Sequence, residues 1–252
     1  MIRLALVGKG GSGKSVIAGT VARLLARDRH RVLALDIDTL PGLAFSIGLG
    51  RIPDAGMPEA LGERREGQGW VLREDISAEA LVDRYALDGP DGIRFLQLGK
   101  LPGHVRPGST VAFRHVVESF HPPGWSIVGD LAAGTRQGFA GWAGFASLVA
   151  IVAEPTEAAF LSVRRLAGLA ETMPGVRIGV VLSKIRGEVR IRTKVADLGI
   201  PVWAEIPYDE SVALAEREGV APIDAAPECH AMALITGFTA RLCGLAQEGV
   251  VV

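Results

Sequence analysis

The chain alternates between short apolar runs and longer amphipathic segments. Runs rich in Val, Ile and Leu predict buried strands, because almost no polar residue interrupts them. These strands are expected at residues 2–7, 32–36, 93–98, 126–130, 148–153, 178–182 and 202–205. Between them apolar residues recur at helical spacing, which predicts helices over residues 14–27, 77–85, 110–120, 156–171, 188–197, 211–218 and 228–247.

This order of elements predicts the fold class. Strand, helix, strand units join parallel strands by crossovers, so we predict an α/β protein with a doubly wound, mostly parallel sheet flanked by helices. At 252 residues, with 48% hydrophobic and 22% charged residues, the chain can bury one large core, and we predict a single domain over residues 1–252. Residues 51–91 are the least regular stretch, with mixed charge and several Gly and Pro.

Such sheets bind ligands at the carboxyl ends of their strands. There the first strand leads into Gly8-Lys9-Gly10-Gly11-Ser12-Gly13-Lys14-Ser15, which fits the phosphate-loop pattern G-x-x-x-x-G-K-[ST] between a strand and a helix. The glycines let backbone N–H groups turn toward phosphate, and Lys14 adds a charge near the β- and γ-phosphates. Ser15 is placed to offer its hydroxyl oxygen to Mg²⁺. The segment therefore predicts a nucleotide site.

Three aspartates follow predicted strands at the same edge of the sheet. Asp38 and Asp130 are candidates for holding magnesium and orienting the attacking water. Asp36 lies two residues before Asp38, so it points to the same side of an extended segment and can support Asp38. The alternative is that such aspartates only form turns or cap helices.

Together with the loop, three further segments resemble the deviant Walker A ATPases, which include the MinD, ParA, nitrogenase iron protein and CooC types. These segments are Asp36-Ile37-Asp38, Asp130-Leu131-Ala132-Ala133-Gly134 and Ile206-Pro207-Tyr208-Asp209. Lys9 within the loop is the mark of the family. The resemblance implies that Lys14 serves the chain's own nucleotide, whereas Lys9 reaches across a dimer interface to the partner's ATP. Without the resemblance, Lys9 would be interpreted as a solvated lysine at a loop edge.

The resemblance also implies roles for individual residues. Catalytic roles fall to Lys9, Lys14 and Asp38, and magnesium ligation falls to Ser15, Asp38 and Asp130. Contacts with ATP or ADP are expected from Gly8, Gly10, Gly11, Ser12, Gly13, Lys14, Ser15, Val16, Ser183, Pro207 and Asp209. Ser183 stands where relatives often have an Asn that contacts adenine, and a hydroxyl cannot make the paired contact of an amide. For Pro207 and Asp209 the alternative is a turn that caps the next helix at Ser211.

Within the family, residues 8–15, 95–100 and 130–134 resemble the CooC type, which implies metalloenzyme maturation. That type carries a C-x-C-P metal motif where this chain has His104-Val105-Arg106-Pro107. Arginine cannot ligate a cation, and one imidazole per chain rarely holds a metal without help. A loop histidine without a metal is therefore the preferred interpretation of His104.

The leading hypothesis is Mg²⁺-dependent ATP hydrolysis coupled to homodimerisation on ATP, with action on a client protein, for which a metalloenzyme is one candidate. The alternatives are a nonenzymatic nucleotide-dependent switch and a ParA-like positioning protein. The 27 Lys and Arg nearly balance the 28 Asp and Glu, so the chain lacks the basic field of a nucleic-acid binder. Neither an export signal, a transmembrane segment nor a metal-ligand cysteine spacing is apparent, and we expect a cytoplasmic protein.

Overall fold

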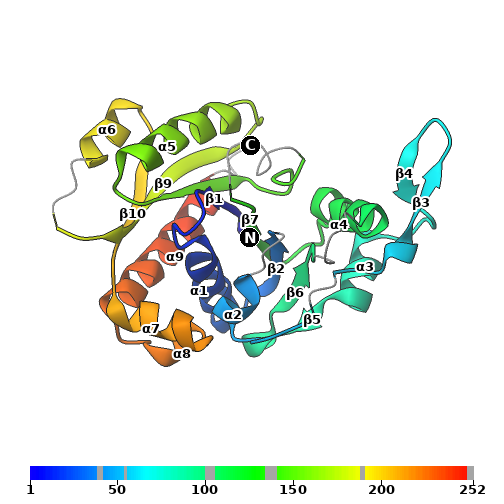
Figure 1. The fold of residues 1–252 in the computed structure, drawn as a ribbon, viewed down its shortest axis with the longest axis horizontal. Coiled ribbons are helices and arrows are strands. Elements are labelled where there is room, and N and C mark those ends of the chain that lie inside the picture. Colours follow the sequence, from blue (N-terminus) through cyan, green and yellow to red (C-terminus); the bar gives the residue numbers. More distant parts are fainter. Residues whose placement is uncertain (39–41, 54–55, 100–105, 134–140, 188–190, 249–252) are drawn as a thin grey trace.

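The computed structural model describes residues 1–38, 42–53, 56–99, 106–133, 141–187 and 191–248. Eight strands form one sheet in the centre (Figure 1). Their spatial order is β10 (Val202–Pro207), β9 (Arg177–Ile185), β8 (Leu148–Ala153), β1 (Arg3–Gly8), β7 (Trp125–Leu131), β2 (Arg31–Ile37), β6 (Arg94–Gln97) and β5 (Leu87–Asp88). Neighbouring strands run parallel except for β5 against β6, so the predicted α/β class and mostly parallel sheet are confirmed.

Helices cover both faces of this sheet (Figure 1). One face carries α1 (Lys14–Arg27), α2 (Leu43–Ile47), α8 (Pro222–Ala225) and α9 (His230–Glu248). The other carries α3 (Ala78–Tyr85), α4 (Pro107–Ser119), α5 (Glu157–Ala170) and α6 (Ile191–Asp197). The short helix α7 (Glu210–Glu218) follows β10 and packs Val212 against the first of these cores.

The two cores follow from the alternation of side chains along the strands. In β1, Leu4 and Leu6 belong to the core beneath α1, whereas Ala5 and Val7 belong to the opposite core. All four are completely buried, which explains why the strand appears in the sequence as a continuous apolar run. The predicted strands and helices all occur, with ends shifted by a few residues, and the predicted helix over 188–197 is described from Ile191 onward.

The segment over residues 51–91 holds elements that the sequence patterns did not predict. They are the 3₁₀ turns η1 (Glu59–Leu61) and η2 (Pro90–Gly92) and an antiparallel hairpin of β3 (Gly62–Arg65) with β4 (Gly69–Leu72). The hairpin projects from the end of the molecule near α3 and α4 (Figure 1). Among the helices that the structure describes, none has both the length and the apolar character needed to cross a bilayer.

Candidate nucleotide and magnesium site

The phosphate loop joins the end of β1 to the start of α1 at the centre of the sheet. A Cβ atom at Gly8 would lie 2.2 Å from the Val152 carbonyl oxygen of β8, so only glycine fits there. Gly13, the residue before α1, has a φ of 89°, which again favours glycine. No side chain caps this helix, so its first N–H groups are available to an anion.

The two lysines of the loop occupy different environments. The Lys14 side chain is only 6% exposed, and its Nζ donates to the Lys9 carbonyl oxygen at 3.4 Å. The backbone N–H of Ser12 donates to the same oxygen at 3.3 Å. The Lys9 residue is itself exposed. Lys14 is therefore buried against its own loop, whereas Lys9 is an exposed residue.

Buried carboxylates lie beside the loop because β2 and β7 are neighbours. Asp36 and Asp130 are register partners on these strands and are 0% and 2% exposed. The Ser15 hydroxyl donates to Asp130 Oδ2 at 2.5 Å, and Asp130 Oδ1 is buried without a hydrogen-bond partner. Asp36 accepts from the backbone N–H groups of Asp38 and Leu43, both at 3.1 Å. The predicted residues Ser15, Asp36 and Asp130 are thus brought together, with the half-buried Asp38 next to them.

Electrostatics at this cluster favour a cation. Burial raises the pKa of Asp36, and the nearby Asp130 raises it further, while the two backbone hydrogen bonds lower it. Burial also raises the pKa of Asp130, against the opposing effects of the Ser15 hydrogen bond and of Lys14. A positive charge between these carboxylates would lower the free-energy cost of ionising each of them in the buried site.

The donor set fits magnesium bound together with a phosphate ligand. Mg²⁺ usually takes one or two carboxylates, several waters and phosphate oxygens. The orphaned Oδ1 of Asp130 and the hydroxyl oxygen of Ser15 suit that role. Within the described ranges, no group of three or more His, Cys, Asp and Glu could hold a metal, so other oxygens would have to complete the coordination.

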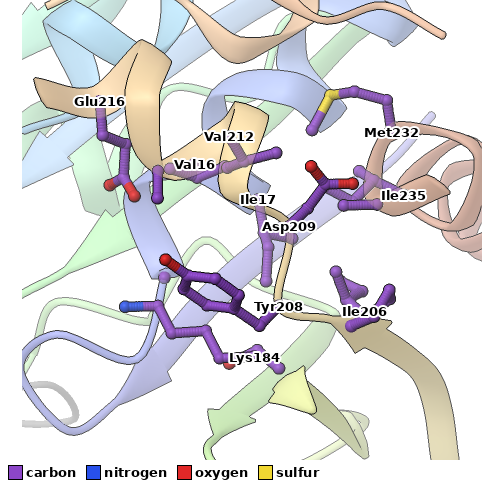
Figure 2. Close-up of a pocket in the computed structure, with 15 residues that line it drawn as sticks. Val16, Ile17, Lys184, Ile206, Tyr208, Asp209, Val212, Glu216, Met232 and Ile235 are labelled. Carbon is purple, nitrogen blue, oxygen red and sulfur yellow. The ribbon is translucent and has the colours of Figure 1, made fainter. Parts of the chain in front are cut away.

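A largely apolar pocket adjoins the loop at Gly13. Figure 2 shows it between α1, α7 and α9, at the ends of β9 and β10. Its apolar walls include Val16, Ile17, Ile206, Pro207, Val212, Met232 and Ile235, and its charged or hydroxyl-bearing side chains are Ser183, Lys184, Tyr208, Asp209 and Glu216. An apolar cleft with a few polar groups, next to an anion-binding loop, suits a planar base attached to phosphates.

Three predicted residues of this pocket have more specific environments. Pro207 lines it, and its contact with a nucleotide stays a prediction. The Ser183 hydroxyl donates to the Ser12 carbonyl oxygen at 2.5 Å, so it is engaged with the phosphate loop. Asp209 lines the pocket and also caps α7, since its Oδ1 accepts from the Ser211 N–H at 3.0 Å. The hydrogen bond from the Ser211 hydroxyl contributes most to lowering the Asp209 pKa.

The sequence did not indicate a role for Lys184. Its Nζ donates to the Gly11 carbonyl oxygen at 2.6 Å, although the two residues are 173 positions apart. Of the other motif residues, His104 and Gly134 lie outside the described residues. Arg106 is described, and its Nε lies 4.0 Å from Glu59 Oε2.

Comparisons with known proteins place these features in a family. A model of the CobQ/CobB/MinD/ParA nucleotide binding domain matches residues 4–223. The carbon monoxide dehydrogenase accessory protein CooC of Rhodospirillum rubrum is 26% identical over 269 aligned positions, covering 96% of this chain and 97% of that protein. An uncharacterized ATP-binding protein of Methanocaldococcus jannaschii is 26% identical over 231 positions, covering 86% of this chain and 90% of the relative.

Solved structures agree on the fold. MinD in the MinC:MinD cell division complex of Aquifex aeolicus superimposes with a TM-score of 0.73 at 20% identity, covering 97% of this chain and 96% of that one. MinD of Pyrococcus horikoshii, complexed with Mg-ADP, gives a TM-score of 0.72 at 17% identity and covers both chains completely. Because the family model spans most of the sequence and the phosphate loop is present, this chain belongs to the CobQ/CobB/MinD/ParA family of nucleotide-binding domains.

Proposed function

We propose that this protein is a Mg²⁺-dependent ATPase that forms a homodimer on ATP and uses the nucleotide cycle to act on a partner protein. The observation that carries the proposal is the Ser15 hydroxyl at 2.5 Å from the buried Asp130, directly after a glycine-rich loop. A phosphate loop alone would suit many anions. A hydroxyl and an orphaned carboxylate oxygen beside it suit a nucleotide bound with magnesium.

The proposed hydrolysis uses groups of this chain to place charge and water. The oxygen of an attacking water bonds to the γ-phosphorus, and the bond from that phosphorus to the β–γ bridging oxygen breaks, which yields ADP and phosphate. Lys14 and the N–H groups at the start of α1 stabilise negative charge on the phosphates. Asp38 orients the water. Magnesium, held by Ser15 and Asp130, would supply further charge neutralisation when bound.

Dimerisation would complete the site from outside. Lys9 is an exposed residue whose ammonium group would approach the phosphates of a second copy, while its carbonyl oxygen accepts from its own loop. A cation supplied in trans stabilises charge that spreads over the γ-phosphoryl group during transfer. Hydrolysis would then depend on the dimer, and the dimer would weaken once the γ-phosphate is lost.

For the partner, a metalloenzyme is the candidate that the likeness to CooC supports, because CooC is named as an accessory protein of carbon monoxide dehydrogenase. We do not extend the proposal to metal binding at residues 104–107. Arg106 Nε lies 4.0 Å from Glu59 Oε2, and a guanidinium cannot ligate a cation.

Phosphate release from ATP tests this function. We expect release that EDTA abolishes, and a loss of at least about 100-fold in Lys14→Met, since that change removes a cation from the γ-phosphate region. Lys9→Met should retain nucleotide binding but hydrolyse at least about 10-fold more slowly. If the protein binds ATP but releases no phosphate, whether or not candidate partners are present, the result would favour the alternative of a nonenzymatic nucleotide-dependent switch. Absence of both ATP and ADP binding would overturn the proposal.

A further inference from the structure

Lys184, at the end of β9, has a backbone conformation that costs free energy. Its φ is 54°, in the left-handed region that residues with a Cβ rarely adopt outside functional or tightly constrained sites. Arg29, with a φ of 62°, shares this feature but lies exposed in the turn between α1 and β2. The two residues therefore offer a matched comparison between a strained position at the site and one remote from it.

At Lys184 the side chain turns toward the phosphate loop. Its Nζ donates to the Gly11 carbonyl oxygen at 2.6 Å and lies 3.9 Å from Glu154 Oε1. The preceding residue, Ser183, is 2% exposed and donates its hydroxyl to the Ser12 carbonyl oxygen at 2.5 Å. Two successive residues of β9 thus bind two successive carbonyl groups of the loop.

These contacts fix the direction of the loop's N–H groups. In a trans peptide the C=O and the following N–H point in opposite directions. The Gly11 carbonyl shares its peptide with the Ser12 N–H, and the Ser12 carbonyl shares its peptide with the Gly13 N–H. When β9 holds both carbonyl groups, both N–H groups are directed to the other side of the loop. There the Ser12 N–H already meets the Lys9 carbonyl oxygen at 3.3 Å.

We propose that Ser183 and Lys184 are positioning residues, which orient the phosphate loop for the phosphates of ADP and ATP before the nucleotide binds. This inference rests on the proposed function. Lys184 also lines the pocket suited to the base, so one residue joins the two parts of the site (Figure 2). The strain at φ 54° is retained because relaxing the backbone would withdraw the ammonium group from Gly11.

The test separates a role in binding from a role in folding. Lys184→Gly removes the ammonium group and also relieves the backbone strain, so the nucleotide-free protein should unfold at no lower temperature than the native chain. Its dissociation constant for ADP, measured by calorimetry, should rise about tenfold or more, because the loop is no longer held in its phosphate-binding orientation before ADP arrives. Arg29→Gly is the control, since it relieves the same kind of strain and should leave the ADP affinity unchanged.

Two further variants distinguish the contribution of the Lys184 ammonium group from that of its aliphatic chain. Lys184→Met keeps an apolar side chain in the wall of the pocket. It should weaken the binding of ADP more than that of AMP, because AMP lacks the β-phosphate that the loop would hold. Lys184→Arg keeps a cationic donor and should restore part of the ADP affinity.

The possible outcomes distinguish this inference from the proposed function. If the native chain fails to bind ADP, the proposed function and this inference both fall. If the native chain binds and Lys184→Gly binds ADP within twofold of it, the positioning role alone is overturned. Parallel losses of affinity and of thermal stability in Lys184→Gly and Lys184→Met would show a general role in folding and would also overturn it.

Discussion

At the scale of single residues, the site concentrates buried charge. Asp36 and Asp130 are register partners on neighbouring strands, and both are almost completely buried. Asp36 satisfies its two oxygens with backbone N–H groups, whereas one oxygen of Asp130 has no partner. A buried carboxylate without a cation costs free energy, so the fold accepts a destabilising arrangement at the place where a magnesium nucleotide would compensate it.

This cost predicts how stability depends on pH in the nucleotide-free protein. The pKa of Asp36 is raised to about 8, chiefly by burial, so on raising the pH the unfolded chain loses this proton before the folded chain does. The free energy of unfolding should therefore be highest near the ordinary carboxyl pKa and fall as the pH rises toward the raised one. The slope from this group should reach at most about 1.4 kcal/mol per pH unit.

Urea unfolding of the native chain and of Asp36→Asn checks this. Asparagine cannot accept both backbone N–H groups, so near the ordinary carboxyl pKa the variant's free energy of unfolding should be lower by about 1–3 kcal/mol. The difference should shrink as the pH rises, because only the native chain loses stability through deprotonation of Asp36. Asp75→Asn, at an exposed position, should show no such trend. A difference that stays constant with pH would contradict the buried-charge account.

The roles of single residues could be predicted from the sequence only where the interacting residues lie close together along the chain. Ser15 and Lys14 follow from a local motif that needs only a strand before it and a helix after it. The contact of Lys184 with Gly11 spans 173 positions and depends on how β8 and β9 continue the sheet beyond β1. No local pattern indicates that the ammonium group would reach a carbonyl oxygen of the loop.

At the scale of elements, the first turn of α4 is fixed by the segment that precedes the β3–β4 hairpin. Glu59 Oε1 accepts from the Gly108 N–H at 2.9 Å, and Oε2 accepts from the Ser109 N–H at 3.1 Å. This carboxylate satisfies N–H groups that the helix cannot pair internally. A Cβ at Gly108 would lie only 2.1 Å from the Glu59 carbonyl oxygen, so the close approach requires glycine.

We therefore expect Gly108→Ala to destabilise the protein, although alanine is normally the better helix residue. The loss should be about 1–3 kcal/mol in the free energy of unfolding, because the segment at Glu59 must move away. Gly168→Ala in α5 is the control. Apart from the backbone of its own helix, no described atom lies within 4 Å of its added Cβ, and the change should stabilise the protein by about 0.5–1 kcal/mol. Equal or greater stability of Gly108→Ala, measured by urea unfolding, would show that the contact is unimportant.

Elements were predictable where burial made them regular. β1 and β8 are buried along nearly their whole lengths, so apolar runs marked both. The hairpin of Gly62–Arg65 with Gly69–Leu72 has strands of four residues, mostly exposed or half-buried, and lacks an apolar alternation. β5 has only two residues and pairs antiparallel to the rest. Such short, solvated elements are set by tertiary contacts, which the chain pattern does not encode.

At the scale of the whole molecule, the order of strands brings the site together. β1 lies between β7 and β8, so its loop is flanked by Asp130 on one side and by the β8–β9 edge on the other. The parallel strands end at one edge, and the phosphate loop, the carboxylates and the apolar pocket beside Gly13 all gather there. Lys9 is the exposed cation of this edge that the proposed function assigns to a second copy.

The proposed function requires that ATP holds two copies together through Lys9. The most direct measurement is the mass in solution with a magnesium-bound nonhydrolysable ATP analogue, with ADP and without ligand, for the native chain, Lys9→Ala and Lys194→Ala. Lys194 is a half-exposed lysine that pairs with Glu157 on α5, so it controls for loss of a lysine elsewhere. If Lys9 acts on the partner's nucleotide, the analogue should increase the dimer fraction in the native chain and in Lys194→Ala, but much less in Lys9→Ala. A monomer in every condition, or a dimer that Lys9→Ala leaves unchanged, would contradict it.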